Sequence, residues 1–160
     1  MSNEIEFEMK GLDQIIKVMK THASIQIGVL GHSARKPKEG QSKTPTNATI
    51  GAVHEFGAPA RGIPARSFLR VPLARHLESH LEKSDLLSED TLKQVIKSGT
   101  QIPWLKKIAI VAEGIVDDAF ESSGDGEWAP WKNPNYHNEG GMLLVDSGQL
   151  RQAITSEVKE

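Results

Sequence analysis

Apolar and polar positions alternate at the start of the chain and then change their period. In residues 4–10, EIEFEMK, every second residue is apolar, which predicts a half-buried strand. Residues 12–19 place apolar side chains at the i, i+3, i+4 and i+7 positions of one helix face, which predicts an amphipathic helix. Alternation returns in residues 24–31, SIQIGVLG. The chain is therefore expected to open with a strand, a helix and a strand.

A polar segment separates this opening from the centre of the chain. Residues 31–46 contain no periodic apolar positions, and their Gly, Pro and Ser content predicts a long exposed loop. Loops of this length are uncommon in compact domains and tend to be functional. The cations of this basic loop are Arg35, Lys36, Lys38 and Lys43.

The next segment, NATIGAVHEFG, predicts a short helix that ends at a turn. Asn47 suits the N-cap, Gly57 suits the position after the last turn, and Phe56 is expected to face inward. Two prolines restrict the backbone of residues 58–65, which are expected to be irregular. Residues 66–70, RSFLR, are expected to form a short strand.

Three further helices are predicted in the middle of the chain. Proline suits the first turn of a helix over residues 72–86, whose leucines recur every four residues. A second helix is expected between Ser88, as its N-cap, and Gly99, as its terminator. The longest helix is expected over residues 103–122.

The apolar face of this longest helix is unusually wide. Ile110, Val111 and Val116 extend it beyond the normal stripe, so it needs either a deep core position or a second partner. We expect a subunit interface at Ile110 and Val111.

The last third of the chain combines a loop composition with large aromatic residues. Residues 124–141 are rich in Gly, Asn and Pro, yet they contain Trp128, Trp131 and Tyr136. Aromatic residues are enriched in interface hot spots, so these three are expected to contact a neighbouring subunit. Residues 142–158 are expected to form a strand, a tight turn, a short helix and a final strand. These patterns predict one α+β domain over residues 1–160: a small mixed or antiparallel sheet against a few helices, with long loops.

Composition narrows the classes of function. The 160-residue chain has no cysteine, which excludes disulfides, thiolate metal sites and cysteine nucleophiles. Its net charge of −2 provides no general attraction to nucleic acid, so any DNA contact must be local. No apolar run approaches the roughly 20 residues that a membrane span needs. We expect no cofactor and no membrane contact.

The titratable residues do not form a recognisable catalytic motif. His54 and Glu55 resemble the start of a metalloprotease motif, but position 58 is alanine where a second histidine is needed. His76 and His80 share one helix flank, for which a solvated surface is the better interpretation than a metal site. We therefore expect a protein that is not an enzyme.

Two charged segments leave alternatives open. The residues SGDGE at 123–127 resemble a calcium loop but lack its later ligands, so a turn is expected. Arg61, Arg66 and Arg70 either bind carboxylates of a neighbouring subunit or face water. The basic loop is either a solvated loop or a non-specific contact for DNA phosphates.

Two separate blocks of sequence carry a resemblance to a known family. The block GAVHEFGAPARGIPARSFLR resembles the H-x-F-G … I-P-A-R-x-F-L signature of bacteriophage virion-morphogenesis proteins. The block GEWAPWKNP … LLVDSGQLRQAI resembles the family's G-x-x-W-x-P-L … L-x-D-T-G-x-L-R-x-S-I ending, in the same order. Trp131 stands where the family commonly has leucine, and Ser67 and Ser147 replace a frequent proline and threonine. The matching positions include His54, Phe56, Gly57, Pro64, Arg66, Phe68, Leu69, Asp146, Gly148, Leu150 and Arg151.

The resemblance implies a structural virion protein without catalytic activity. Such proteins form rings at the junction of head and tail, which implies an oligomer of six- or twelve-fold symmetry beside head-completion, adaptor and tail proteins. It also implies assembly in the cytoplasm of a host bacterium and non-specific contact with the packaged DNA. The alternatives are a tail terminator or minor tail protein, a DNA-binding accessory protein, and a small hydrolase built around His54 and Glu55.

Overall fold

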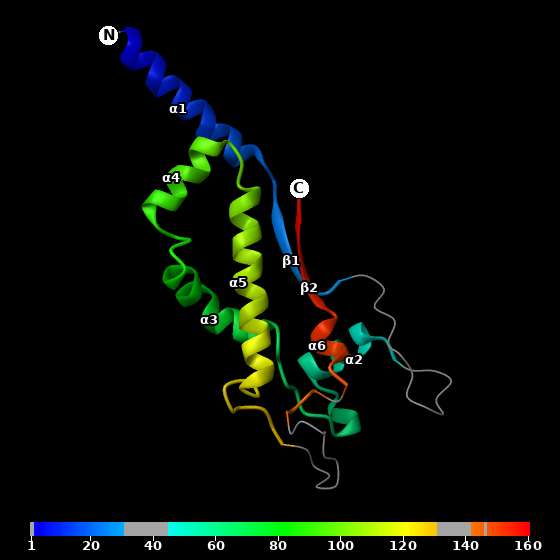
Figure 1. Ribbon diagram of the computed structural model, residues 1–160. Coiled ribbons are helices and arrows are strands. Elements are labelled where there is room, and N and C mark those ends of the chain that lie inside the picture. Colours follow the sequence, from blue (N-terminus) through cyan, green and yellow to red (C-terminus); the bar gives the residue numbers. More distant parts are fainter. Residues whose placement is uncertain (1, 31–44, 131–141, 146) are drawn as a thin grey trace. The chain divides into compact units, whose positions relative to one another are not determined.

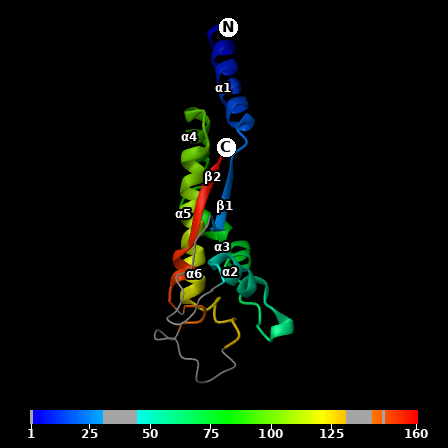
Figure 2. The same cartoon turned by 90° about the vertical axis from the view of Figure 1, so that its right-hand side faces the viewer.

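The computed structural model describes residues 2–30, 45–130, 142–145 and 147–160 (Figure 1). In these residues six α-helices accompany one antiparallel sheet of two strands, which confirms the expected α+β class. The strands β1 and β2 run side by side in both views of the ribbon (Figure 2). The elements are α1 Ser2–Lys20, β1 Ser24–Val29, α2 Asn47–Phe56, the 3₁₀ turn η1 Pro59–Arg61, α3 Arg70–Lys83, α4 Glu89–Ser98, α5 Ile102–Glu121, α6 Gln149–Gln152 and β2 Ile154–Lys159.

The chain divides into two compact units, and four elements pass from one unit into the other. The first unit contains Met1–Gln26, Glu78–Val111 and Glu157–Glu160, and the second contains Ile27–Leu77 and Ala112–Ser156. The boundaries fall inside β1, α3, α5 and β2. In the described part of the chain, no helix is both long and apolar enough to cross a membrane.

In the first unit, helix α1 replaces the strand expected over residues 4–10. The helix runs without a break from Ser2 to Lys20 and includes the amphipathic stretch that the sequence predicted. Five of the seven residues in EIEFEMK are Glu, Met or Lys, which favour helices over strands. The intrinsic preference of these residues therefore outweighs the alternating pattern.

Helix α4 has the limits that its capping residues predicted. Ser88 accepts a hydrogen bond from the Thr91 amide at 3.2 Å, and Gly99 ends the helix in the left-handed conformation with φ 69°. Nearby, the indole of Trp104 donates to the Leu86 carbonyl at 2.9 Å. Side-chain capping satisfies amides that a helix end leaves without partners.

Helix α2 has the predicted residues but different capping. Thr46, not Asn47, is the N-cap, because its hydroxyl accepts from the Thr49 amide at 3.1 Å. Gly57 follows the helix as expected, with φ 76°. Phe56 does not face inward: it is 66% exposed, and the guanidinium of Arg70 lies 5.9 Å from its ring centroid.

Two predicted strands do not form. Residues 66–69 bend into the start of α3, because the amides of Phe68 and Leu69 donate to the Glu55 carboxylate instead of to a neighbouring strand. Residues 142–145 form a turn, in which Leu144 has φ 65° and the Val145 amide bonds the Met142 carbonyl. By contrast, the final strand and the short helix before it are present as β2 and α6.

The core of the second unit packs around helix α5. The helix matches the long helix that the sequence predicted, and Val116, on its wide apolar face, is 1% exposed and belongs to the core. Buried residues from both sequence blocks pack with this helix in one cluster. Phe68, Trp128, Leu144 and Leu150 come from the blocks, and Val116, Ala119 and Phe120 from the helix.

Candidate functional site

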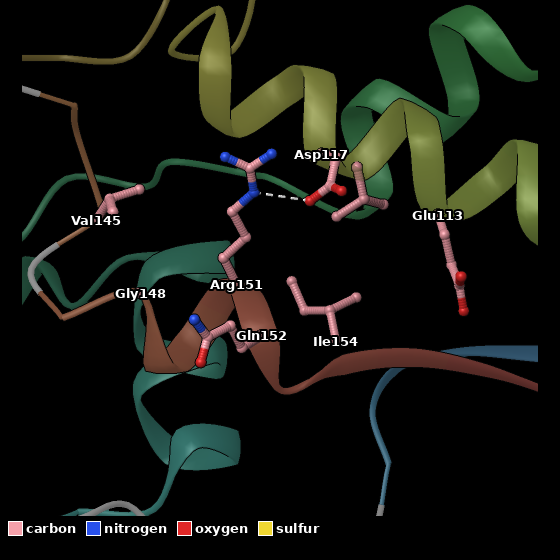
Figure 3. Close-up of a pocket in the computed structure, with 8 residues that line it drawn as sticks. Glu113, Asp117, Val145, Gly148, Arg151, Gln152 and Ile154 are labelled. Atoms are coloured by element: carbon pink, nitrogen blue, oxygen red, sulfur yellow. Dashed lines mark hydrogen bonds and ion pairs between the residues drawn. The ribbon is translucent and has the colours of Figure 1, made fainter.

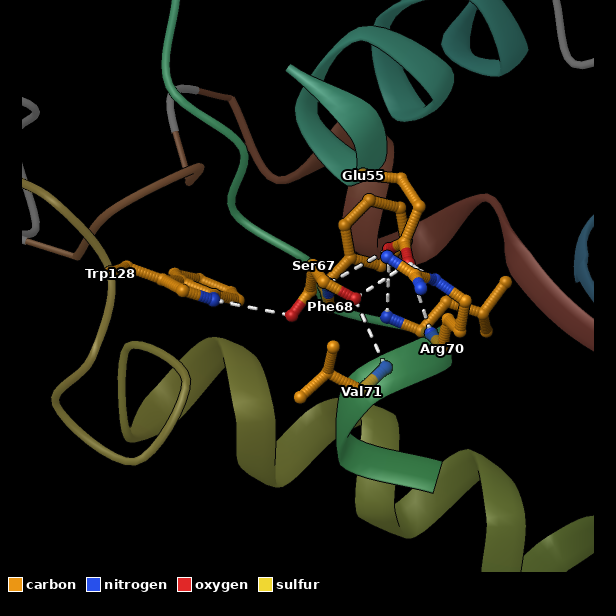
Figure 4. Close-up of polar contacts among 7 residues, drawn as sticks. Glu55, Ser67, Phe68, Arg70, Val71 and Trp128 are labelled. Carbon is orange, nitrogen blue, oxygen red and sulfur yellow. Dashed lines mark hydrogen bonds and ion pairs between the residues drawn. The ribbon is translucent and has the colours of Figure 1, made fainter. Parts of the chain in front are cut away.

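The carboxylate of Glu55, at the end of α2, is the polar centre of the first sequence block. It is 5% exposed and accepts hydrogen bonds from the amides of Phe68, Leu69 and Arg70 at 3.0–3.1 Å (Figure 4). The Ser67 hydroxyl donates to the same carboxylate at 2.6 Å. These are amides of the first turn of α3 and of the two residues before it, which have no acceptor within the helix. Glu55 therefore caps α3 from another helix, where a negative charge also complements the helix dipole.

Ser67 extends this cap to the next residue of the helix. Its hydroxyl oxygen accepts from the Val71 amide at 3.0 Å, and the same hydroxyl donates its hydrogen bond to Glu55 (Figure 4). One hydroxyl thus satisfies a backbone donor and a buried carboxylate together. A proline at this position could not supply either bond.

The connection between α2 and α3 is a tight corner. The Arg66 amide donates to the His54 carbonyl at 2.7 Å, and Ala58 and Ile63 form an isolated antiparallel bridge. A Cβ on Gly57 would lie 2.8 Å from the Ala65 nitrogen, closer than real Cβ atoms approach. Glycine is therefore required at position 57 for space as well as for its positive φ.

Arg66 joins the first sequence block to the second. Its side chain is 2% exposed; Nε donates to the Ala129 carbonyl at 2.8 Å and Nη2 to the Pro130 carbonyl at 3.2 Å. Burial lowers the pKa of the Arg66 guanidinium below its usual value. Both alternatives predicted for Arg66, a bond to a neighbouring subunit and a position facing water, are therefore wrong, whereas Arg61 is exposed.

The aromatic residues make a second junction between the blocks. Phe68 lies 5.1 Å from Phe120, and Phe120 meets the Trp128 ring edge-on at 5.9 Å between centroids. The Trp128 indole donates to the Ser67 carbonyl at 3.2 Å (Figure 4). At 8% exposure, Trp128 is a core residue, so the expectation that it contacts a neighbouring subunit is wrong. A loop with few apolar residues covers this core by inserting one large ring.

Arg151, from the end of the second block, binds helix α5. Its Nε donates to Asp117 at 2.8 Å (Figure 3). Its Nη2 donates to Glu121 at 2.7 Å. The hydrogen bonds to Asp117 and Glu121 raise the pKa of the Arg151 guanidinium above its usual value. Arg151 and Asp117 line a pocket of about 510 Å³.

Other predicted residues fall in different environments. Leu150 is buried, and a Cβ on Gly51 would touch both Leu150 and Phe68, so α2 also packs between the two blocks. Ile110 is 68% exposed and Val111 is half-buried, so both are available in part to a partner. Several candidates lie outside the described residues. They are Arg35, Lys36, Lys38, Lys43, Trp131, Tyr136 and Asp146.

The histidine flank of α3 leads to a salt-bridge cluster. His76 Nε2 is 2.8 Å from Asp125, and Arg75 is 2.9 Å from Glu127. Asp125 and Glu127 belong to the turn that resembled a calcium loop. In the residues that the structure covers, no group of three or more His, Cys, Asp or Glu side chains is suited to hold a metal ion.

The capping role of Glu55 is not visible in the sequence motifs. A signal was present, because a glutamate in the last turn of a helix opposes the helix dipole and needs a partner elsewhere. The pattern could not say that the partner is the first turn of α3.

Comparison with protein-family models, with curated proteins and with solved structures finds no match to this chain.

Proposed function

We propose that the chain is a structural virion protein, a ring subunit of the head–tail junction of a tailed bacteriophage. The observation that carries the proposal is the direct joining of the two blocks that resemble the family. Arg66 binds the carbonyls of residues 129 and 130, and Trp128 binds the carbonyl of Ser67. Two distant motifs that resemble one structural family are expected to fold against each other, and these two blocks do so in the second unit.

The polar groups of the signature support an architectural role over a catalytic one. The Glu55 carboxylate is occupied by four internal donors and is buried. A general base or nucleophile needs lone pairs that can reach a substrate proton or atom. The oxygens of Glu55 instead accept hydrogen bonds at the start of α3. This argues against a hydrolase that uses Glu55 as its general base.

Gene deletion in the phage or prophage that encodes the chain tests this proposal. Negative-stain microscopy of the lysate is expected to show DNA-filled heads beside separate tails. Overlong tail tubes would instead favour a tail terminator, and intact infectious particles would refute a role in assembly.

Complementation adds a matched comparison to this experiment. A plasmid copy with Arg61→Ala, on the exposed arginine, is expected to restore joined particles. A copy with Arg66→Ala is expected to restore few of them, since the two blocks lose the Arg66 bonds to residues 129 and 130. Equal rescue by both variants would contradict the architectural role of the junction.

A further inference from the structure

The outer edge of strand β2 is occupied by a side chain instead of a strand. In the described residues the sheet has two strands only, and a two-stranded sheet is marginally stable by itself. The Ser156 amide donates to the Glu113 carboxylate of α5 at 2.6 Å. Strand geometry alternates the direction of successive amides, so this bond marks the edge of β2 opposite β1. Open strand edges are ready templates for pairing with another chain.

A pocket adjoins this edge and has two kinds of lining. Its volume is about 510 Å³, and Val116, Val145 and Ile154 give it an apolar part. Glu113 and Asp117 lie on its polar rim (Figure 3). An apolar recess beside a strand edge is an arrangement by which proteins bind extended peptides, and here the Ser156 amide would exchange Glu113 for the peptide.

Among the described residues around the pocket, carboxylates outnumber the cation that contacts them. Arg151 is bonded to Asp117 and Glu121, whereas the Glu113 carboxylate accepts from the Ser156 amide. The Glu113 carboxylate holds a neutral amide, and a cation would form a stronger charge-assisted bond with it. The complement of this rim is therefore an extended segment with a basic side chain.

We propose that the β2 edge at Ser156, with the adjoining pocket, binds an extended basic segment of a different protein. The main-chain carbonyl of that segment replaces Glu113 as the acceptor of the Ser156 amide. The released Glu113 carboxylate pairs with a Lys or Arg of the segment. An apolar residue two positions along, on the same face of the bound strand, enters the pocket beside Val116 and Ile154.

The strands of this chain favour a different protein over a second copy. β1, SIQIGV, has no cationic residue, and Lys159 of β2 lies 3.7 Å from Glu157 in its own strand. Neither described strand offers an unengaged basic side chain to the edge. This inference does not depend on the proposed ring, because a ring joins copies of this chain, whereas the β2 edge is proposed to bind a different protein.

A peptide titration of the full ¹⁵N-labelled chain tests the proposal by NMR. The probe is the acetylated and amidated heptapeptide TVTKTVT, which places valines two positions from a central lysine. Saturable shifts of the Ser156 and Ile154 amides are expected. The peptide TVTETVT is expected to bind about tenfold more weakly, since it places like charges together. TVTKTVT that is N-methylated at the alternate amides facing β2 cannot pair with this strand. It is therefore expected to cause no shift of the Ser156 and Ile154 amides.

Charge reversal on the protein provides the control. Glu113→Lys is expected to prefer TVTETVT over TVTKTVT, whereas Asp118→Lys, on an exposed residue of α5 outside the pocket lining, should keep the original preference. If Glu113→Lys does not fold, Glu113→Gln is expected to lose most of the discrimination. Absence of binding at millimolar peptide, or shifts away from Ser156, overturns the proposal. Concentration-dependent shifts of the Ser156 amide without peptide also overturn it, because the occupant would then be a second copy.

Discussion

Arg66 and Ala129 are 63 residues apart in the chain, yet the Nε of Arg66 donates to the Ala129 carbonyl at 2.8 Å. The second donor of the same guanidinium binds the next carbonyl, that of Pro130. A planar fork with fixed donor directions can hold two successive carbonyls, and a lysine cannot reproduce it. This contact holds the end of the described loop against the α2–α3 corner.

The first prediction concerns this fork. Arg66→Ala is expected to lower the free energy of unfolding by about 3–5 kcal/mol, because it empties a buried site and removes the bonds to the Ala129 and Pro130 carbonyls. Arg66→Lys should recover only part of that loss. Urea denaturation measures both variants, and Arg61→Ala serves as the exposed control. A loss below about 1 kcal/mol for Arg66→Ala would contradict the structural role assigned to it.

The second prediction concerns the cap on α3. Glu55→Ala removes the acceptor of three amides and of the Ser67 hydroxyl. We expect a loss of roughly 3–4 kcal/mol in the free energy of unfolding, of the order of two unsatisfied buried donors. Glu55→Gln keeps one acceptor oxygen and is expected to lose less. The exposed Glu78→Gln is the control, and equal stability of all three variants would refute the cap.

The third prediction uses two glycines of the same turn. A Cβ on Gly124, at φ 65°, would lie 2.2 Å from the Trp128 indole nitrogen, whereas a Cβ on Gly126, at φ 78°, meets nothing within 4 Å. Gly126→Ala is therefore expected to cost only the left-handed penalty of roughly 1–2 kcal/mol. Gly124→Ala should cost more, and it should also shift the tryptophan emission. Thermal melts followed by fluorescence measure the difference, and equal melting temperatures would show that Trp128 does not pack on this turn.

The fourth prediction compares two phenylalanines. Phe68 is 3% exposed in the aromatic core, while Phe56 is 66% exposed. Phe68→Ala is expected to lower the free energy of unfolding by about 3–5 kcal/mol, and Phe56→Ala by less than about 1 kcal/mol. Denaturant unfolding gives both values. A larger loss for Phe56→Ala would mean that its ring is buried in solution, for instance in an oligomer.

Local signals in the sequence predicted the helices well. Ser88 and Gly99 fix the limits of α4, and the apolar stripe of α5 is long enough to be unambiguous. Residues 4–10 failed because their alternation is only one of two signals, and helix-forming residues carry the other. Periodicity describes which side of an element is apolar, but it does not measure the preference of each residue for that element.

Contacts between distant residues explain the remaining differences. RSFLR was expected to form a short strand, but Glu55, from a different helix, is the acceptor of its last three amides. Trp128 looks like an interface residue because its loop is polar, but the core that it fills is made by Phe68 and Phe120. No sequence spacing encodes either contact, because each joins residues that are far apart in the chain.

Helix α5 and strand β2 each continue from one compact unit into the other, and this continuity has a consequence for cooperativity. A helix is stabilised by each turn that continues it, so unfolding of the α5 residues in one unit leaves a shorter and less stable helix in the other unit. Trp104 belongs to the first unit and Trp128 to the second, and each indole donates a hydrogen bond within its own unit. The two units should therefore unfold in one transition, with no temperature at which one of them persists alone.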